Sequence, residues 1–189
     1  MKPNSHHGQA MIAYGANWAR MVRTAVLAVT LVAATAAGFS LQSSDIVNNR
    51  PIPKAFWAVR CGGVNRSPEL DWNAPPTGTA SFAIVMHDAD APMPGGFYHW
   101  VAYDIPRQTQ RLNAGAPMPG RYGLTSAQKA EYHGPCPPPG KVHHYRITLY
   151  ALDLARIEAP QPLSGPQLEA RVAGHVLAST VLVGTAQTP

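Results

Sequence analysis

Nineteen prolines and sixteen glycines interrupt this chain of 189 residues at short intervals. Proline has no backbone N–H and a fixed φ, so it ends helices and is excluded from central strands. Between these interruptions lie three apolar or alternating runs, which predict core strands at residues 81–87, 97–105 and 144–152. The fold expected is mainly β, with two sheets packed face to face and long loops rich in proline and glycine.

Two further segments have weaker patterns. Residues 55–60 (AFWAVR) are a weaker strand candidate. Residues 166–182 place Leu168 and Val172 at helical spacing, and Pro166 suits a first helical turn. We therefore expect one amphipathic helix near the C-terminus.

The N-terminus carries the features of a secretory signal. An uncharged apolar run at residues 24–37 follows Arg20 and Arg23, and small residues near its end suit a cleavage site. The alternative is an uncleaved anchor, although the run reaches only about 18 residues, the short end for a spanning helix. We expect residues 1–37 to be a signal peptide with its upstream region. Residues 38–189 would then be one domain of a secreted or periplasmic protein without a stable membrane span.

Net charge argues against a nucleic-acid partner. The whole chain has 15 basic and 10 acidic residues, a formal charge of +5. Removing residues 1–37 takes away Lys2, Arg20 and Arg23 and no acid, which leaves a formal charge of +2. No cluster of lysine and arginine remains, so the sequence lacks the electrostatic footprint of a nucleic-acid binder.

The two cysteines, Cys61 and Cys136, are an even number in a chain that has an export signal. An oxidising compartment lets such a pair close, so we expect a disulfide between them. If the protein is instead cytosolic, two free, buried, small hydrophobic side chains are the better interpretation.

Scarce polar residues gather where the expected strands begin or end. Asp88 and Asp90 are two apart at the end of one strand, so a strand that persisted that far would place both carboxylates on one side. His99 comes early in the next strand, and His143 and Tyr145 stand at the head of the third. A carboxylate beside an imidazole fixes its tautomer and favours its cationic form, which can hold an anion. These residues predict one small anion-binding pocket.

Other functions could use the same side chains. A metal-dependent hydrolase would use the aspartates and histidines, but the sequence has no helical His-x-x-x-His and no cysteine-rich ligand spacing. A serine hydrolase would need a Gly-x-Ser-x-Gly motif, which is missing. A third possibility is an inhibitor that acts through a protruding surface, in which case the pocket would have no part in its function. We expect a protein without enzymatic activity, metal or cofactor, and keep the metal-dependent hydrolase as the alternative.

The remaining histidines have weaker interpretations. His87, at a strand end, is expected to lie outside the site, and His175 to pack in the interior or against the expected helix. His133 and His144 neighbour the pocket residues in sequence, and the pattern does not decide between a structural and a functional role for them.

A series of motifs occurs in order along residues 50–185. They are Cys61-Gly-Gly-Val-Asn65-Arg-Ser67-Pro68-Glu-Leu-Asp-Trp72, Asp88-Ala-Asp90-Ala-Pro92, His99-Trp100, Gly134-Pro-Cys136-Pro-Pro138, His143-His-Tyr145 and Ala151-Leu-Asp153. Together they resemble the phosphatidylethanolamine-binding protein family, and in particular its bacterial Raf kinase inhibitor-like branch. Each motif alone would be weak, and their order makes the resemblance specific.

The resemblance implies a β-sandwich with a small pocket for a phosphate-type anion and usually no catalysis. The implied ligands are a phosphate-bearing small molecule or a phospholipid head group. Particular branches of the family inhibit kinases or serine proteases, so regulation of a protein partner of this kind is a further hypothesis for this chain. The implied ligand-binding residues are Asp88, Ala91, Pro92, His99, Gly134, Pro135, Pro138, His143 and Tyr145, with Asp90 as the second aspartate of its motif.

The chain departs from the family pattern at two positions. Ala89 stands where the family commonly has proline, which removes a backbone restraint and keeps both carboxylates. His144 stands where the family commonly has arginine, which removes a salt bridge that such an arginine could make to the pocket loop.

Overall fold

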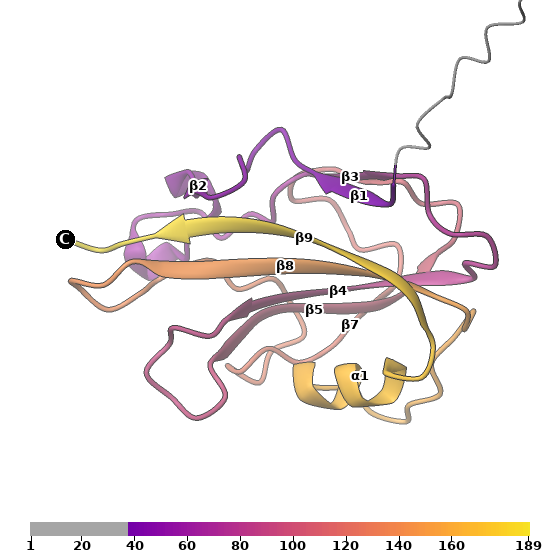
Figure 1. Ribbon diagram of the computed structural model, residues 1–189. Coiled ribbons are helices and arrows are strands. Elements are labelled where there is room, and N and C mark those ends of the chain that lie inside the picture. Colours follow the sequence, from indigo (N-terminus) through magenta and orange to yellow (C-terminus); the bar gives the residue numbers. More distant parts are fainter. Residues whose placement is uncertain (1–37) are drawn as a thin grey trace, which may run out of the picture. The chain divides into compact units, whose positions relative to one another are not determined.

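The computed structural model describes residues 38–189, and the strands of this part of the chain form two sheets (Figure 1). The signal peptide expected over residues 1–37 lies outside the described residues. Within residues 38–189 we find no helix with the length and apolar character needed to cross a membrane.

The larger sheet has six strands, and all three predicted core strands belong to it. Neighbouring strands run antiparallel except in one short parallel pair at the edge. The predictions at residues 81–87, 97–105 and 144–152 are confirmed to within one residue at each end. The order across the sheet is β2 (Arg50–Pro51), β9 (Val176–Ala186), β8 (His143–Leu152), β4 (Ser81–Asp88), β5 (Phe97–Pro106) and β7 (Arg121–Tyr122).

A second, smaller sheet covers one face of the larger sheet. It consists of β1 (Ser40–Gln42), β3 (Leu70–Asn73) and β6 (Arg111–Leu112). Phe82, Ile84 and Met86 of β4 are buried in the core that includes Trp72 of the smaller sheet. The two packed sheets confirm the expected mainly β architecture.

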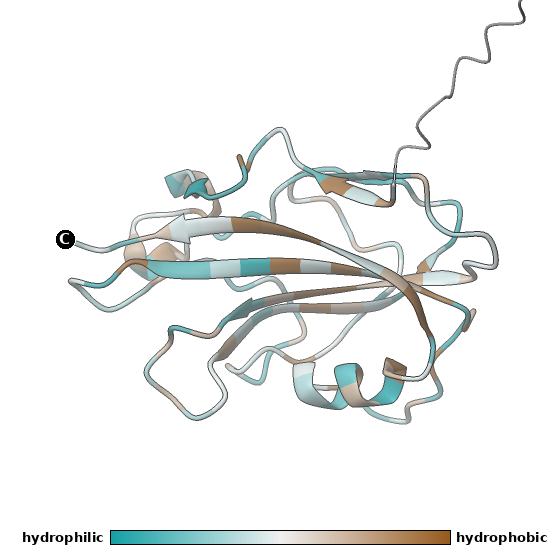
Figure 2. Cartoon of the chain, viewed as in Figure 1, coloured by the Kyte–Doolittle hydropathy of each residue, from teal (hydrophilic) through white to brown (hydrophobic). Residues whose placement is uncertain are grey.

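The opposite face of the larger sheet is covered by the one α-helix of the described residues, α1 (Gly165–Val172) (Figure 1). Ala83 and Val85 of β4 share a second core with Leu168 and Val172 of this helix. Because alternate residues of β4 serve two cores, the strand has no polar face until it ends, and Figure 2 shows it as largely hydrophobic.

The prediction of a helix over residues 166–182 is only partly right. α1 ends at Val172, and after a short turn the chain continues as β9, which pairs with β8 along its whole length. The sequence of β9, VLASTVLVGTA, is rich in β-branched residues, which fit a pleated surface. Pairing with β8 therefore outweighs the helical spacing in this segment, and the helix is followed by the last strand.

The weaker strand candidate at residues 55–60 is wrong. The segment forms two 3₁₀ turns, η1 (Lys54–Phe56) and η2 (Val59–Cys61), whose backbone hydrogen bonds are local. Phe56 and Trp57 are nevertheless buried in the core, which accounts for the strand-like composition.

The expected disulfide joins Cys61, at the end of η2, to Cys136 in the loop before β8, with the Cα atoms 5.6 Å apart. The two cysteines are 75 residues apart in sequence. For a loop of this size the chain-entropy model gives a stabilisation of about 4 kcal/mol.

Close packing of α1 on β5 leads to a testable prediction at Gly165. A Cβ atom on Gly165 would come within 1.9 Å of Cδ1 of Tyr98. The Tyr98 hydroxyl donates to Glu169 of the same helix at 2.8 Å, so the ring has little freedom to move aside. We expect Gly165→Ala to lower the free energy of unfolding by about 2 kcal/mol, a typical cost of overpacking.

The matched control is Gly174→Ala, because no atom lies within 4 Å of a Cβ at Gly174. Its free energy of unfolding should change by less than about 0.5 kcal/mol. Denaturant unfolding measures both variants, and equal stabilities would contradict the packing described at Gly165.

Candidate functional site

A cavity of about 190 Å³ lies at the end of the larger sheet where β4 ends and β5 and β8 begin. Its walls come from η2, the turn after β4, the loop before β8 and the first residues of β5 and β8. Segments far apart in sequence thus meet at one place. The lining residues are Arg60, Asp88, Ala91, Pro92, Met93, Phe97, His99, His133, Cys136, Pro137, Pro138, His143 and Tyr145.

Asp88, the last residue of β4, forms a buried pair with His143, the first residue of β8. The Asp88 Oδ2 atom lies 2.7 Å from Nδ1 of His143, and the two side chains are 3% and 4% exposed. Asp88 Oδ1 accepts the backbone N–H of Asp90 at 2.9 Å. The carboxylate fixes a proton on Nδ1 of His143, and a cationic His143 carries a second donor at Nε2.

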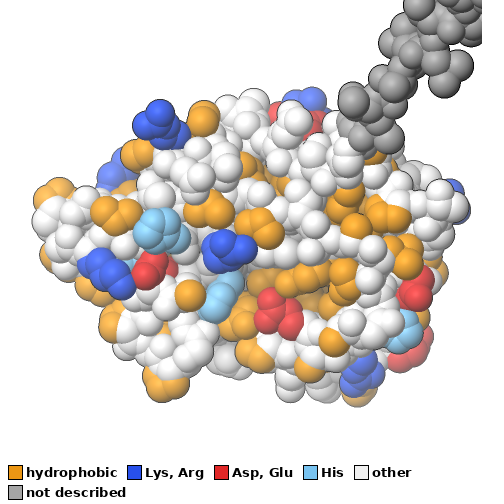
Figure 3. All heavy atoms as spheres, viewed as in Figure 1, with side chains coloured by type: hydrophobic (Ala, Val, Ile, Leu, Met, Phe, Trp, Pro, Cys, Tyr) orange, Lys and Arg blue, Asp and Glu red, His pale blue; other side chains and the backbone are white. Residues whose placement is uncertain are grey.

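Asp90 does not share this site, because β4 ends at Asp88 and the two-residue alternation stops there. The carboxylate of Asp90 lies at the rim, 3.0 Å from Nζ of Lys141 and 2.8 Å from Nδ1 of His144. Hydrogen bonds from His144 and then from Lys141 lower the pKa of Asp90 well below its usual value. Figure 3 shows acidic side chains beside basic and histidine side chains on the face that it presents.

Adjacent residues of a strand point to opposite faces, and β8 uses this alternation at its first two positions. His143 is buried with Asp88, whereas His144 is exposed with Asp90. The family commonly has an arginine at position 144. In this chain the backbone N–H and Nδ1 of His144 both bond Oδ2 of Asp90, in the turn after β4.

Tyr145 lines the cavity, and its hydroxyl is buried. Its side chain is fully buried, and its hydroxyl has no hydrogen-bond partner among the described residues. Burial, and secondly the negative charge of Asp88, raise the pKa of Tyr145, so the phenol keeps its proton at neutral pH. A buried polar group without a partner costs about 1–3 kcal/mol, a cost that a ligand accepting this hydrogen bond would remove.

His99 is neutral, which corrects the expectation that a neighbouring aspartate favours its cationic form. Its Nδ1–H donates to the backbone carbonyl of His133 at 2.7 Å. The ring is 5% exposed and packs against Phe97 and Tyr145. Burial lowers the pKa of His99 to about 3. The remaining ring nitrogen of His99 can therefore accept a hydrogen bond at neutral pH but cannot donate one.

The proline-rich loop before β8 is fastened to the segment around η2. Besides the disulfide, the side chain of Asn65 bonds the loop twice. Its Oδ1 accepts the backbone N–H of Gly134 at 2.8 Å, and its Nδ2 donates to the carbonyl of Tyr132 at 3.1 Å. The wall of the cavity is thus held at Cys136 and at two residues that precede it.

The structure brings together most of the residues that the family resemblance implied for the ligand site, and whether they bind a ligand stays a prediction. Asp90 lies on the rim. Gly134 and Pro135 are not among the lining residues, and a Cβ on Gly134 would clash with the Phe56 carbonyl oxygen. Glycine is therefore needed at position 134 for packing. The implied residues that line the cavity are Asp88, Ala91, Pro92, His99, Pro138, His143 and Tyr145.

Sequence reasoning did not assign Arg60, Met93 or Phe97 to the site, although all three line the cavity. One signal for Arg60 was present, because this residue precedes Cys61, and the expected partner Cys136 lies among the pocket motifs.

The other histidines have different outcomes. His133, whose role the sequence left open, lines the cavity. His87 lies outside it as expected, with Nε2 2.8 Å from the carbonyl oxygen of Gly95. His175 was expected in the interior or packed against the helix. Its side chain is instead 44% exposed in the turn after α1 and pairs with Asp153 at 2.9 Å.

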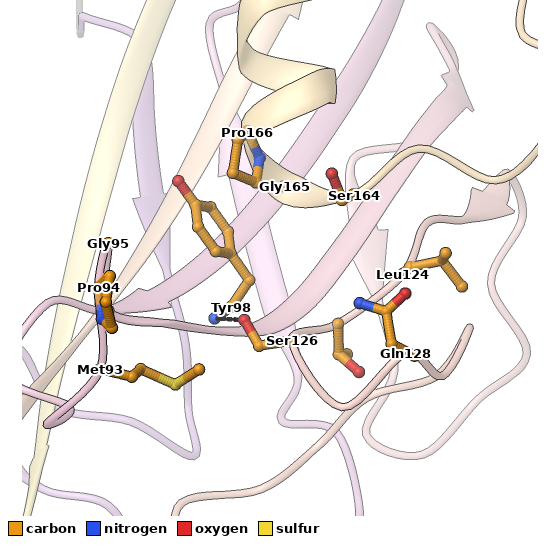
Figure 4. A pocket seen from close by; sticks show the side chains of 12 residues that line it. Met93, Pro94, Gly95, Tyr98, Leu124, Ser126, Gln128, Ser164, Gly165 and Pro166 are labelled. Atoms are coloured by element: carbon orange, nitrogen blue, oxygen red, sulfur yellow. Dashed lines mark hydrogen bonds between the residues drawn. The ribbon is translucent and has the colours of Figure 1, made fainter.

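A second cavity, of about 300 Å³, lies between the turn after β4, Tyr98 and the start of α1 (Figure 4). No charged side chain lines this second cavity. Ser126 accepts the backbone N–H of Tyr98 at 2.9 Å, and the first turn of α1 is closed by a capping box between Ser164 and Gln167. Ser126 and Ser164 thus already have partners within the protein, unlike the Tyr145 hydroxyl.

The metal-dependent hydrolase alternative would need several ligating side chains around one point. Within residues 38–189, no group of three or more histidine, cysteine, aspartate or glutamate side chains is placed to hold a metal ion. The carboxylates of Asp88 and Asp90 each bond a different histidine, on opposite faces of β8.

The buried, neutral His99 predicts how stability depends on pH. Its pKa is about 3 in the folded protein and near 6.5 in the unfolded chain, so the unfolded chain binds more protons between these values. The free energy of unfolding should therefore rise with pH across this window. In His99→Gln this slope, measured by denaturant unfolding between about pH 4.5 and 6, should fall by up to about 1.4 kcal/mol per pH unit. His175→Gln, in the exposed turn, is the control, and an unchanged slope in His99→Gln would contradict a neutral His99.

Known proteins resemble this chain in sequence and in structure. A sequence model described as phosphatidylethanolamine-binding protein matches residues 42–187. YbhB of Escherichia coli (strain K12) is 35% identical over 148 residues, which cover 74% of this chain and 94% of YbhB. A protein of Mycobacterium tuberculosis (strain H37Rv), named as a candidate lipoprotein, LppC, is 35% identical over 159 residues, which cover 82% of this chain and 76% of LppC.

The crystal structure of YbcL of E. coli, described as a new member of the mammalian PEBP family, superposes with a TM-score of 0.76 at 28% sequence identity. The superposition covers 81% of this chain and 100% of the YbcL chain. With the family match extending over nearly all of the described residues, this chain belongs to the phosphatidylethanolamine-binding protein family.

Proposed function

We propose that this protein binds a phosphate-type anion in the cavity of about 190 Å³, either as a small phosphate ester or as the head group of a phospholipid. The observation that carries the proposal is the buried hydroxyl of Tyr145, a residue that lines the cavity. This hydroxyl makes no hydrogen bond within residues 38–189, and the Asp88 carboxylate lies close enough to raise its pKa. Since its phenol stays protonated, the group is a hydrogen-bond donor that a phosphate oxygen would satisfy.

The Asp88–His143 pair suits the same ligand. With His143 cationic, the pair is neutral as a whole, and Nε2 of His143 can donate to an anion. Asp88 then stabilises the imidazolium and holds its ring in place, as a carboxylate behind a histidine commonly does. An anion in the cavity would meet two fixed donors on the first residues of β8, His143 and Tyr145.

The remainder of the cavity wall is largely apolar. Ala91, Pro92, Phe97 and Pro138 exclude water from around the two donors, which strengthens hydrogen bonds to a charged ligand. The small volume fits a phosphate group and a short substituent rather than a polymer.

We also infer export of the protein. Three observations support this: the apolar run at residues 24–37, the Cys61–Cys136 disulfide, and the relative named as a candidate lipoprotein. Regulation of a kinase or protease, and the lack of enzymatic activity, stay predictions.

Tyr145→Phe tests the proposed function. We expect this variant to bind phosphoethanolamine about tenfold more weakly than the unsubstituted protein, because one hydrogen bond to a charged ligand is lost. Its free energy of unfolding should be unchanged or higher, since the substitution removes a buried hydroxyl that has no partner. Calorimetric titration and denaturant unfolding measure the two quantities.

Tyr150→Phe is the matched control, because its hydroxyl bonds Glu169 at 3.1 Å, outside the cavity. This control should bind phosphoethanolamine as the unsubstituted protein does. The proposal fails if the unsubstituted protein does not bind phosphoethanolamine, or if Tyr145→Phe binds it equally well.

A further inference from the structure

Arg60 is the one lysine or arginine among the residues that line the cavity, and it is exposed at its mouth. Within residues 38–189 its guanidinium takes part in no ion pair or side-chain hydrogen bond, whereas Lys141 nearby is bound to Asp90. A guanidinium offers several N–H donors in a planar arrangement that matches phosphate oxygens. The cavity thus has a permanent cation that is not neutralised by the protein.

The backbone around Arg60 is held against the opposite wall. Arg60 lies in η2 directly before Cys61, which is bonded to Cys136 of that wall. Two residues earlier, the N–H of Ala58 donates to the carbonyl of Pro135 at 3.1 Å. The position of Arg60 at the mouth is therefore set by a covalent bond and a backbone hydrogen bond.

His133 lines the cavity from the loop before β8, close enough to Arg60 for the charge of Arg60 to lower its pKa. Its backbone is fixed by two hydrogen bonds with His99, from the His133 N–H at 2.8 Å and to the His133 carbonyl at 2.7 Å. Burial, and secondly the charge of Arg60, lower the pKa of His133, so its ring is a neutral donor near the guanidinium. Arg60 and His133 together form what we call the outer subsite.

The two ends of the cavity differ in charge. The inner end holds the Asp88 carboxylate with His143, a pair whose net charge is zero at most. A second negative charge on a ligand is therefore unfavourable near Asp88 and favourable near Arg60. This difference matters for phosphate, because a monoester carries close to two negative charges above its second pKa of about 6, whereas a diester carries one.

We propose that the outer subsite, Arg60 with His133, takes the second negative charge of a phosphate monoester, so that the cavity selects monoesters over diesters. The proposal rests on the proposed function, because Tyr145 and His143 would hold the first phosphate oxygens. It narrows the ligand class to small phosphate monoesters and disfavours an intact phospholipid, in which the phosphate is a diester.

The test compares two probes, methyl phosphate and dimethyl phosphate, by titration of the full chain at pH 7, where the monoester is already mostly a dianion. The unsubstituted protein should bind methyl phosphate about tenfold more tightly than dimethyl phosphate. In Arg60→Gln this ratio should fall to about two or less, because affinity for the dianion falls while affinity for the monoanion changes little. Arg60→Lys keeps the charge and should retain part of the preference.

Arg107→Gln is the matched control, because Arg107 is exposed in the connection from β5 to β6 and the substitution removes the same charge away from the cavity. It should leave the ratio unchanged. Two outcomes would falsify the proposal of an outer subsite and leave the proposed function standing. One is an affinity ratio near one in the unsubstituted protein, and the other is an equal loss of affinity for both probes in Arg60→Gln. Failure of both probes to bind the unsubstituted protein would overturn the proposed function itself.

Discussion

The buried carboxylate of Asp88 has to be compensated where it lies, because an isolated charge in a protein interior costs several kcal/mol. It ends a strand that is covered on both faces, and its partners are Nδ1 of His143 and the backbone N–H of Asp90. β8 must therefore begin beside the end of β4, and the chain must turn immediately after Asp88. The need to compensate the Asp88 charge thus accounts both for the alignment of β4 with β8 and for the turn that forms one wall of the cavity.

The sequence predicts an element well when the pattern of that segment alone identifies it, and poorly when the element depends on a partner elsewhere in the chain. β4, β5 and β8 could be predicted, because each is an apolar run bounded by turn residues. β9 could not, because its alternation has meaning only against β8, and taken alone the segment also fits helical spacing. Residues 55–60 have a strand-like composition because Phe56, Trp57 and Ala58 are buried in the core, but the segment lacks a neighbouring strand to pair with.

The same distinction applies to the site. The ordered motifs placed Asp88, His143 and Tyr145 correctly beside one cavity. Asp90 would share the side of Asp88 only if β4 continued through residue 90, but the strand ends at Asp88. A hydrophobic pattern does not locate a strand end to within two residues. Arg60 reaches the cavity only through tertiary contacts of η2, so no strand periodicity could place it there.

The disulfide makes the order of the cavity wall depend on the redox conditions of the compartment in which the protein lies. The loop before β8 carries three consecutive prolines and is tied at Cys136 and by Asn65, so its conformational freedom is small before any ligand arrives. A wall that is already ordered lowers the entropic cost of binding, which matters most for a small anion that makes few contacts. In a reducing compartment the Asn65 bonds remain, but the covalent link between Cys61 and the wall is lost. An oxidising compartment therefore favours both closure of the disulfide and the arrangement of Arg60 opposite the donors of β8.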